Sequence, residues 1–225
     1  MGRAKRIDTG GIVYHVINRA NGRLRIFKKR ADFEAFERIL AEGIERFGMR
    51  VCGYCIMGNH WHLVLWPRDD GDMSQFMRWV TLTHTQRWHV AHGTVGIGHV
   101  YQGRYKSFPV QGNSHYLTVM RYVEANPLRA KMVETAGDWP WSSLAVRLGT
   151  EKELPISRGP VALPTNWARH VALTIDRNDL AAIENCLKRG APLGNELWIK
   201  QTVAKLEREK VSDTSYEARC VNGYF

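Results

Sequence analysis

The sequence predicts an α+β fold: a ferredoxin-like split β-α-β sandwich with a central antiparallel sheet, followed by a small α-helical C-terminal extension. Two observations support this prediction. Segments typical of strands alternate with segments whose apolar residues have helical spacing, in the order β-α-β-β-α-β-α. Beyond Trp139-Pro140-Trp141 the chain changes to a proline-rich stretch and two short helices. We therefore expect a first domain at 1–148 and an extension at 149–225.

Each expected element has a local reason. Apolar residues at helical spacing predict the helices, and short apolar or alternating runs predict the strands. Gly58-Asn59 is a two-residue hairpin signal, and Pro127 ends the third helix near Asn126. Both hairpin strands are apolar on their two sides, so we expect them at the centre of the sheet, with the helices on one face. The expected strands are 11–18, 49–57, 60–66 and 104–110, and the expected helices are 32–47, 73–90, 114–125, 177–189 and 195–209.

The composition favours a polyanionic partner. The 225 residues include 32 Lys and Arg against 22 Asp and Glu, a formal net charge of +10 with a pI near 9.7. No stretch is apolar enough to span a bilayer and the basic N-terminus lacks a signal-peptide core, so we expect a cytoplasmic protein without membrane association. Cys52 and Cys55 form a C-x-x-C. Positions i and i+3 of a strand face opposite ways, so we expect buried apolar cysteines in preference to a zinc site.

The segment M-G-N-H-W-H-L-V-L-W at 57–66 places two histidines at the start of an apolar strand. Positions i and i+2 of a strand share a face, so His60 and His62 leave the sheet together while Trp61 points the other way. Two imidazoles in this arrangement can bind one divalent ion. The alternative is a pair of hydrogen-bonded core histidines, and the motif alone does not decide between the two.

The expected helix 114–125 offers two further groups. Tyr122 and Asn126 are four residues apart and share a helix face, which would lie over the histidines if the helix packs on the sheet. Asn126 offers an oxygen as a third ligand, and Tyr122 offers a phenol as a nucleophile toward phosphate. Two nitrogens and one oxygen suit Mg²⁺ or Mn²⁺, although imidazole also suits zinc. The alternative for Tyr122 is a tyrosine that only packs on the sheet.

Four ordered blocks carry a resemblance to a known family. They are G-N-H-W-H (58–62), G-H-V-Y-Q-G-R-Y-K-S (98–107), Y-V-E-A-N-P-L-R-A (122–130) and W-P-W-S-S (139–143). Together they resemble the REP-associated tyrosine transposases, relatives of the single-tyrosine HUH transposases of small insertion sequences. The resemblance covers roughly residues 8–145, with weaker similarity at R-G-A-P-L-G-N-E-L-W (189–198).

The resemblance implies a mechanism and an HUH-endonuclease type of catalytic domain at 1–148. His60 and His62 would hold a divalent ion that polarises a phosphate in single-stranded DNA. Tyr122 would attack that phosphate, leaving a 5′-phosphotyrosine bond and a free 3′-hydroxyl. The reverse attack would rejoin strands without a nucleotide cofactor. Asn126 would be the third ligand, at a position where insertion-sequence relatives often have glutamine.

The implied substrate is a palindromic repeat folded into a hairpin, with a short guide tetranucleotide at its foot, bound as single-stranded or hairpin DNA by a monomer or homodimer. Cations could contact phosphates while an aromatic ring stacks on unpaired bases. The candidate DNA-contacting residues are Arg104, Tyr105 and Lys106 on the expected strand 104–110, and Arg23, Arg25, Lys28 and Lys29 in the basic run R-L-R-I-F-K-K-R. The alternative for the basic run is a solvated loop. The extension is a further candidate for DNA contacts, but its end, E-A-R-C-V-N-G-Y-F, departs from the arginine- and proline-containing end of many relatives.

Two other functions stay open at this stage. A non-catalytic binder of structured nucleic acid would keep the fold and the basic surface without turnover. A metal-dependent hydrolase would use the histidines with zinc, would leave Tyr122 structural and would form no covalent adduct with DNA. If Tyr122 is not the nucleophile, Tyr116 on the same helix is the next candidate.

Overall fold

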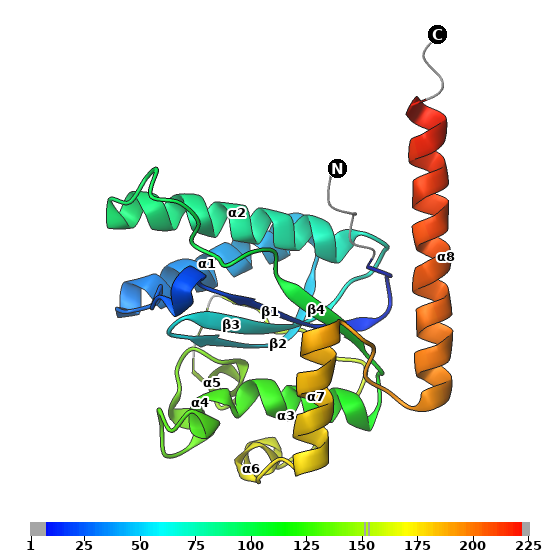
Figure 1. Ribbon diagram of the computed structural model, residues 1–225. Helices are drawn as coiled ribbons and strands as arrows, with labels where there is room; N and C mark the ends of the chain where they lie inside the picture. The colour runs from blue at the N-terminus through cyan, green and yellow to red at the C-terminus, as the bar shows by residue number, and fades with distance from the viewer. Residues whose placement is uncertain (1–7, 151, 153, 222–225) are drawn as a thin grey trace.

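The computed structural model describes residues 8–150, 152 and 154–221, with side chains described as far as residue 208. The described strands are β1 (Val13–Arg19), β2 (Arg50–Met57), β3 (His60–Trp66) and β4 (Lys106–Val110). The described helices are η1 (Asn21–Arg23), α1 (Arg30–Phe47), α2 (Asp72–His92), α3 (Ser114–Glu124), α4 (Asn126–Arg129), η2 (Ala136–Asp138), α5 (Ser143–Arg147), α6 (Trp167–Ala172), α7 (Arg177–Arg189) and α8 (Glu196–Val221). The α+β class and the order β-α-β-β-α-β-α through α3 are confirmed (Figure 1).

The four strands form one antiparallel sheet in the order β2-β3-β1-β4. The expectation that both hairpin strands are central is correct for β3 and wrong for β2, which lies at an edge. A later loop covers that edge: the Ile56 N–H donates to Trp141 O, and the Ser157 N–H donates to Val51 O, each at 2.9 Å. This cover pairs backbone groups at the outer edge of β2 that would otherwise be exposed.

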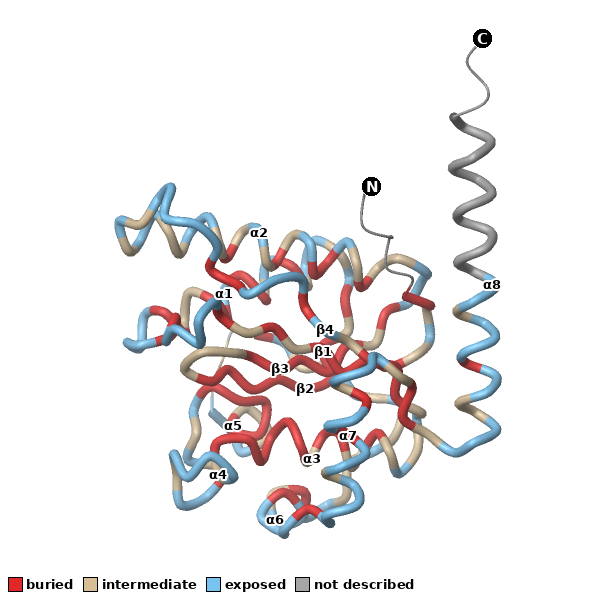
Figure 2. The backbone as a smooth tube through the Cα atoms, viewed as in Figure 1, coloured by how far each residue is buried: buried red, intermediate tan, exposed pale blue. Residues whose placement is uncertain are grey.

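Helices cover both faces of the sheet, which corrects the expectation of helices on one face (Figure 1). α1 and α2 pack on the face that includes Trp61 and Leu63, whereas α3 packs on the face that includes Val64 and Phe108. Figure 2 shows that buried residues concentrate in the strands and along α3. Strands that are apolar on both sides require a packed layer on each side, and the continuous apolar run of the hairpin already contained this information.

Helix ends follow local chemistry. The Asp32 carboxylate accepts two backbone N–H groups at the start of α1, and Gly48, with φ of 62°, caps its C-terminal end after Phe47. Asn113 caps α3 by accepting a backbone N–H at 2.9 Å. α3 ends at Glu124, and Pro127 lies in the first turn of the separate α4, where its missing N–H costs no helical hydrogen bond.

Two element boundaries differ from the sequence expectation. β4 begins at Lys106, so residues 104–105 precede the strand. Tyr101 first bridges to Ala20, the residue after β1, then the chain bends and pairs with β1 itself only from Lys106 onward. α8 continues to Val221 and not only to 209, because no glycine or proline interrupts residues 196–221.

The extension packs into the core of the first domain. Trp167, Ile183 and Cys186 are buried together with residues of α3. Leu193 forms a parallel bridge with Val110, and its N–H donates to the carbonyl oxygen of Pro109 at 2.8 Å. The segment R-G-A-P-L-G therefore pairs with the outer edge of β4. The division at residue 148 stays a prediction.

Two further expectations concern membranes and cysteines. Within the described part of the chain, no helix combines the length and the apolar character needed to cross a bilayer. Cys52 and Cys55 are both fully buried, and burial raises the pKa of the Cys52 thiol to about 11. The side chain of Cys220 lies outside the described residues.

Candidate active site

Two imidazoles lie close together at the start of β3. The ring centroids of His60 and His62 are 5.1 Å apart and the ring planes are tilted by 76°, while Trp61 lies in the core on the opposite face of the sheet. His62 is 2% exposed and His60 is half-buried. The strand alternation predicted from sequence therefore brings both rings to one place, which solvent reaches at His60.

A hydrogen bond fixes the proton on His60. Its Nδ1–H donates to Asn59 Oδ1 at 2.6 Å, because an amide oxygen can only accept. The other ring nitrogen, Nε2, therefore keeps its lone pair, as a metal ligand must. Burial, and secondly the nearby Arg19, lowers the pKa of His60 to about 4, so the ring is neutral at neutral pH.

A third histidine, His15 on β1, was missed by the sequence reasoning. It is fully buried, and its Nε2 lies 2.9 Å from His62 Nδ1. Burial, and secondly Arg129, lowers the pKa of His15 to about 3. Burial, followed by the charges of the neighbouring histidines, holds the pKa of His62 well below its usual value. The sequence did contain a signal, because His15 is a polar residue inside the apolar strand G-I-V-Y-H-V-I-N. It lies two positions before Ile17, which pairs with His62, and therefore on the same face.

The contact between His15 and His62 joins two neutral rings, so one nitrogen donates and the other accepts. His62 Nε2 keeps its lone pair only if His62 Nδ1–H donates to His15. His15 must then carry its own proton on Nδ1, a buried atom for which no hydrogen-bond partner is found among the described residues. The arrangement that prepares His62 as a ligand therefore leaves one polar atom of His15 unsatisfied.

Helix α3 brings Tyr122 to the histidines. The centroid of the Tyr122 ring is 5.7 Å from that of His62 and 5.9 Å from that of His15, in near-perpendicular contacts. Tyr122 is 7% exposed, and the guanidinium carbon of Arg129 lies 4.0 Å from its ring centroid. Tyr116, the second candidate nucleophile, is buried on the same helix against Gly159.

Asn126 is held by a different contact from the one predicted. Its Oδ1 accepts a hydrogen bond from Arg129 Nη2 at 2.8 Å, and its amide nitrogen donates to the carbonyl oxygens of Tyr122 and Val123. Asn126 is adjacent to the nucleophile candidate, but its oxygen is bonded to a guanidinium. The role of a third metal ligand requires Arg129 to release that oxygen, and it stays a prediction.

A buried carboxylate fixes the tyrosine helix in place. Glu124 is fully buried and accepts hydrogen bonds from the Ser143 hydroxyl, the Arg147 guanidinium and the Trp167 indole. The Ser143 hydroxyl also accepts the backbone N–H of Tyr54 on β2 at 2.9 Å. This network links the block Y-V-E-A-N-P to W-P-W-S-S and to the extension, which gives these motifs a positioning role.

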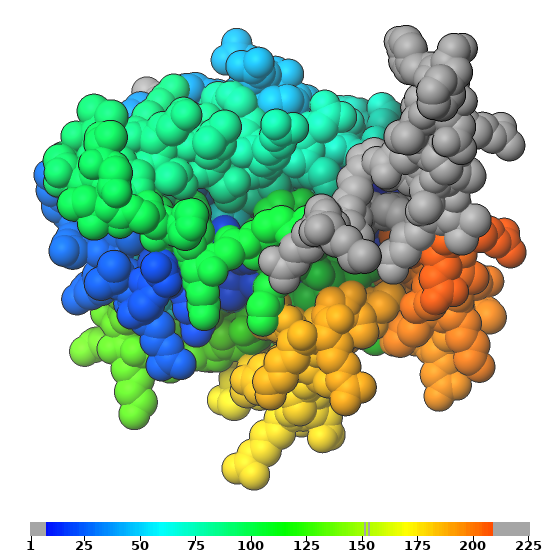
Figure 3. Space-filling view, turned by 45° about the horizontal axis from the view of Figure 1, so that its top comes forward, coloured from blue at the N-terminus to red at the C-terminus, as the bar shows by residue number. Residues whose placement is uncertain are grey.

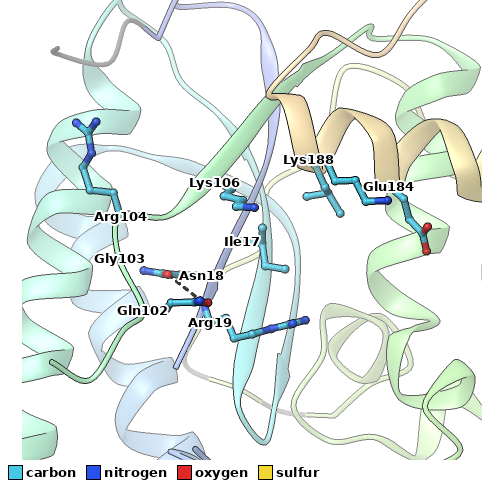
Figure 4. A pocket seen from close by; sticks show the side chains of 10 residues that line it. Ile17, Asn18, Arg19, Gln102, Gly103, Arg104, Lys106, Glu184 and Lys188 are labelled. Atoms are coloured by element: carbon cyan, nitrogen blue, oxygen red, sulfur yellow. Dashed lines mark hydrogen bonds between the residues drawn. The ribbon is translucent and has the colours of Figure 1, made fainter. Parts of the chain in front are cut away.

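A groove of about 660 Å³ is lined by cross-strand neighbours of the two histidines, and Figure 4 shows its lining residues. His62, Ile17 and Lys106 are cross-strand neighbours on β3, β1 and β4, and Arg19 is the cross-strand neighbour of His60. Neighbouring side chains of this kind share a face of the sheet. The groove is lined by Ile17, Asn18, Arg19, Gln102, Gly103, Arg104 and Lys106, and by Glu184, Leu187 and Lys188 of α7.

The other predicted DNA-contacting residues divide into two groups. Arg104 and Lys106 are exposed at the groove, but Tyr105 is only 7% exposed and packs in the core, which removes it as a stacking surface in this structure. In the basic run, buried Phe27 donates its N–H to Gly58 O at 3.1 Å. The exposed Arg23, Arg25, Lys28 and Lys29 therefore lie on a loop that is anchored to the hairpin carrying His60.

Comparisons with known proteins show the family of this chain. A family model described as "Transposase IS200 like" matches residues 9–126, just over half of the chain. A solved structure of a REP-associated tyrosine transposase bound to a REP hairpin is 17% identical, covers 73% of this chain and all of its own chain, and has a TM-score of 0.53. A putative transposase from Deinococcus radiodurans R1 is 17% identical over 55% of this chain and 96% of its own, with a TM-score of 0.39. No curated protein matches the chain.

Proposed function

Because the chain belongs to the IS200-like transposase family, we propose that it cleaves and rejoins single-stranded DNA through a covalent 5′-phosphotyrosine at Tyr122. One observation carries this proposal. Tyr122 comes from α3 and the two histidines come from β3, yet their side chains meet in one cluster in which the ring centroids of His62 and Tyr122 are 5.7 Å apart. A phenol beside paired neutral imidazoles suits nucleophilic attack on phosphate.

The proposed exchange conserves ester bonds. The phenol oxygen of Tyr122 attacks the phosphorus, a P–O bond to the tyrosine forms, and the P–O3′ bond breaks. The phenolic proton ends on the departing 3′ oxygen. A 3′-hydroxyl that attacks the phosphotyrosine reverses the exchange, so rejoining needs no nucleotide cofactor. The Arg129 guanidinium over the Tyr122 ring is placed to neutralise negative charge that the phosphate brings to this cluster.

The donor atoms fit a divalent ion at two positions, namely His60 and His62 in their neutral forms. Among the described residues, no three His, Cys, Asp or Glu side chains are grouped to bind a metal. Further ligands would then be neutral or substrate oxygens, with Asn126 the protein's candidate, which favours Mg²⁺ or Mn²⁺. A bound ion would polarise a phosphate oxygen.

We propose hairpin DNA with an unpaired flank as the substrate. The net charge of +10 favours a polyanion, and the similar solved structure is bound to a REP hairpin. The groove beside the histidines carries cations from the sheet and from α7, which would attract such a flank.

The test is a covalent adduct that resists denaturation. The full chain is incubated with Mg²⁺ and a labelled oligonucleotide that carries a hairpin and an unpaired flank. We expect an adduct with the native protein, none with Tyr122→Phe, and an undiminished adduct with Tyr116→Phe as the matched control. Binding without cleavage would instead indicate a non-catalytic binder, and cleavage without an adduct would indicate a metal-dependent hydrolase.

A further inference from the structure

Helix α7 forms a fixed wall of the groove beside the histidines. Its buried residues Ile183 and Cys186 pack in the same core as α3, and Gly190 ends the helix with φ of 71°. The following segment is bonded to β4 through Leu193. Figure 3 shows α7, yellow to orange, projecting from the surface beside the green residues of the β4 region. The wall is therefore attached to the sheet at its C-terminal end and through its buried face.

One face of α7 lines the groove. Glu184, Leu187 and Lys188 are spaced i, i+3 and i+4, so they share a helix face. Figure 4 shows Glu184 and Lys188 on α7 across the groove from Lys106, with Arg19 extending along its floor. The guanidinium of Arg104 points away from these cations in the same view. The groove thus has cations on two opposite sides.

The size and charge of the groove favour a single strand of nucleic acid. Its volume of about 660 Å³ lies within the range of small-ligand pockets, which suits one or two nucleotides and excludes a duplex. Arg19, Lys106 and Lys188 can each contact a phosphate. Among the described lining residues, Glu184 is the one acid. A carboxylate repels phosphates. If a strand binds in this groove, we therefore expect the Glu184 carboxylate to face a base and not the phosphate backbone.

We propose that this groove holds the unpaired strand next to the cleavage site, and that α7 contributes both a phosphate contact, Lys188, and a base-reading group, Glu184. The Glu184 carboxylate accepts a hydrogen bond from a base with an exocyclic amino group and disfavours thymine, which has none. This inference rests on the proposed function, because it assigns the strand that Tyr122 would cleave. It makes the extension a determinant of which flank is accepted.

The two contacts predict different changes in binding. Lys188→Ala removes a phosphate contact, so it weakens binding to all flank sequences alike and reduces the slope of log affinity against log salt by about 1. Glu184→Ala removes the base contact, so a preference of roughly tenfold for a cytosine over a thymine flank falls toward one. Arg189→Ala and Asp179→Asn are the matched controls, because both residues are exposed on α7 outside the groove.

The experiment measures fluorescence anisotropy of labelled hairpins with dC or dT flanks, in the Tyr122→Phe background so that no turnover occurs. Binding by Lys188→Ala that matches Arg189→Ala would overturn the strand path. An unchanged base preference in Glu184→Ala would overturn the reading role. The adduct assay, run with Tyr122 intact, separates this inference from the proposed function. If the native protein forms the adduct but the groove variants bind DNA as the controls do, only the inference is rejected. If the groove variants change binding but the native protein forms no adduct, only the cleavage mechanism is rejected.

Discussion

The two faces of the sheet use the same strands for different purposes. The face under α1 and α2 is an aromatic and aliphatic core in which Trp61 stacks on Phe36 at 5.6 Å between centroids. The face under α3 also has an apolar core, but it buries His15 and His62 beside Tyr122. Strand alternation lets the single segment His60-Trp61-His62 serve both faces.

This difference shows how the site obtains rigid support. The Trp61 indole donates to the Tyr101 hydroxyl at 2.9 Å, and that hydroxyl also lies 2.7 Å from His84 Nδ1. The strand is thereby anchored from behind by groups that do not touch the histidine pair. The opposite face can then accommodate an unsatisfied polar atom, His15 Nδ1, because the core behind it supplies the stability.

The largest expected effect comes from substitutions on the face that carries the histidines, which should abolish most DNA cleavage. His60→Ala and His62→Ala should each reduce cleavage on the order of 10³-fold or more, because a lost metal contact removes several kcal/mol of transition-state stabilisation. EDTA should do the same to the native protein. Cleavage rates on a hairpin-flanked oligonucleotide measure the effect.

The control for this prediction is the buried histidine of the other face. His84→Gln should leave cleavage near the native rate, because Gln can still bond to Tyr101. Equal losses in His84→Gln and His62→Ala would show that the two faces are not functionally distinct.

The next effect concerns stability and comes from the opposite face. Trp61 is fully buried, so Trp61→Ala should reduce the free energy of unfolding by about 3–5 kcal/mol, as large aromatic truncations in cores do. Urea unfolding followed by circular dichroism measures it, with Leu24→Ala, a highly exposed position, as the control. Loss of cleavage at unchanged stability would place Trp61 in the site and not in the scaffold.

Much of the fold followed from sequence because its signals are local. Hydrophobic spacing located every strand and the helices α1, α2, α3 and α7 to within a few residues, although α8 runs twelve residues past its expected end, and Gly58-Asn59 located the hairpin. The cover of β2 by Trp141 and Ser157 could not be predicted, because such contacts join segments far apart in the chain. The same limit hid the pairing of Leu193 with β4.

The site was predictable where it depends on period and not where it depends on tertiary contacts. Two-residue spacing placed His60 and His62 on one face, and helix packing on that face brought Tyr122 to them. The partner of Asn126 is Arg129, three residues later, and nothing in the spacing distinguishes this contact from a metal ligand. Burial of Tyr105 likewise depends on a tertiary contact that its sequence neighbours do not reveal, in which its hydroxyl lies 3.5 Å from Ser74 Oγ on α2.

A smaller expected effect is the pH dependence of stability that a buried histidine on each face produces. Burial lowers the pKa of His15 and of His84 to about 3, in the latter case against the opposing charge of Asp32. The folded pKa lies below the unfolded value of roughly 6.5, so the unfolded state binds more protons between these values. The stabilisation is complete above pH 6.5 and is lost as the pH falls toward 3.

Lowering the pH from 7 to 5 should therefore reduce the free energy of unfolding by roughly 2 kcal/mol for each of these two histidines. His84→Gln and His15→Gln should each flatten the pH dependence by about that amount, measured by urea unfolding in EDTA. An unchanged slope in His84→Gln would mean that His84 is protonated inside the folded protein. An unchanged slope in His15→Gln alone would show that His15 does not contribute to the pH dependence of stability.

The smallest expected effect separates stability from metal binding at a single position, His15. His15→Phe removes the acceptor for His62 Nδ1–H together with the unsatisfied Nδ1 atom, while keeping an aromatic ring beside Phe108. Stability should change little, because the variant removes one buried polar atom without a partner, His15 Nδ1, and leaves another, His62 Nδ1, without its acceptor. Affinity for Mn²⁺ should fall by about tenfold, near the lower end for such supporting groups, because a neutral imidazole is a weaker acceptor than a carboxylate. Calorimetric titration with Mn²⁺ measures this, and His15→Gln, which restores an acceptor, should recover part of the affinity. Native affinity in His15→Phe would show that His62 needs no orienting partner, and that the buried pair is structural.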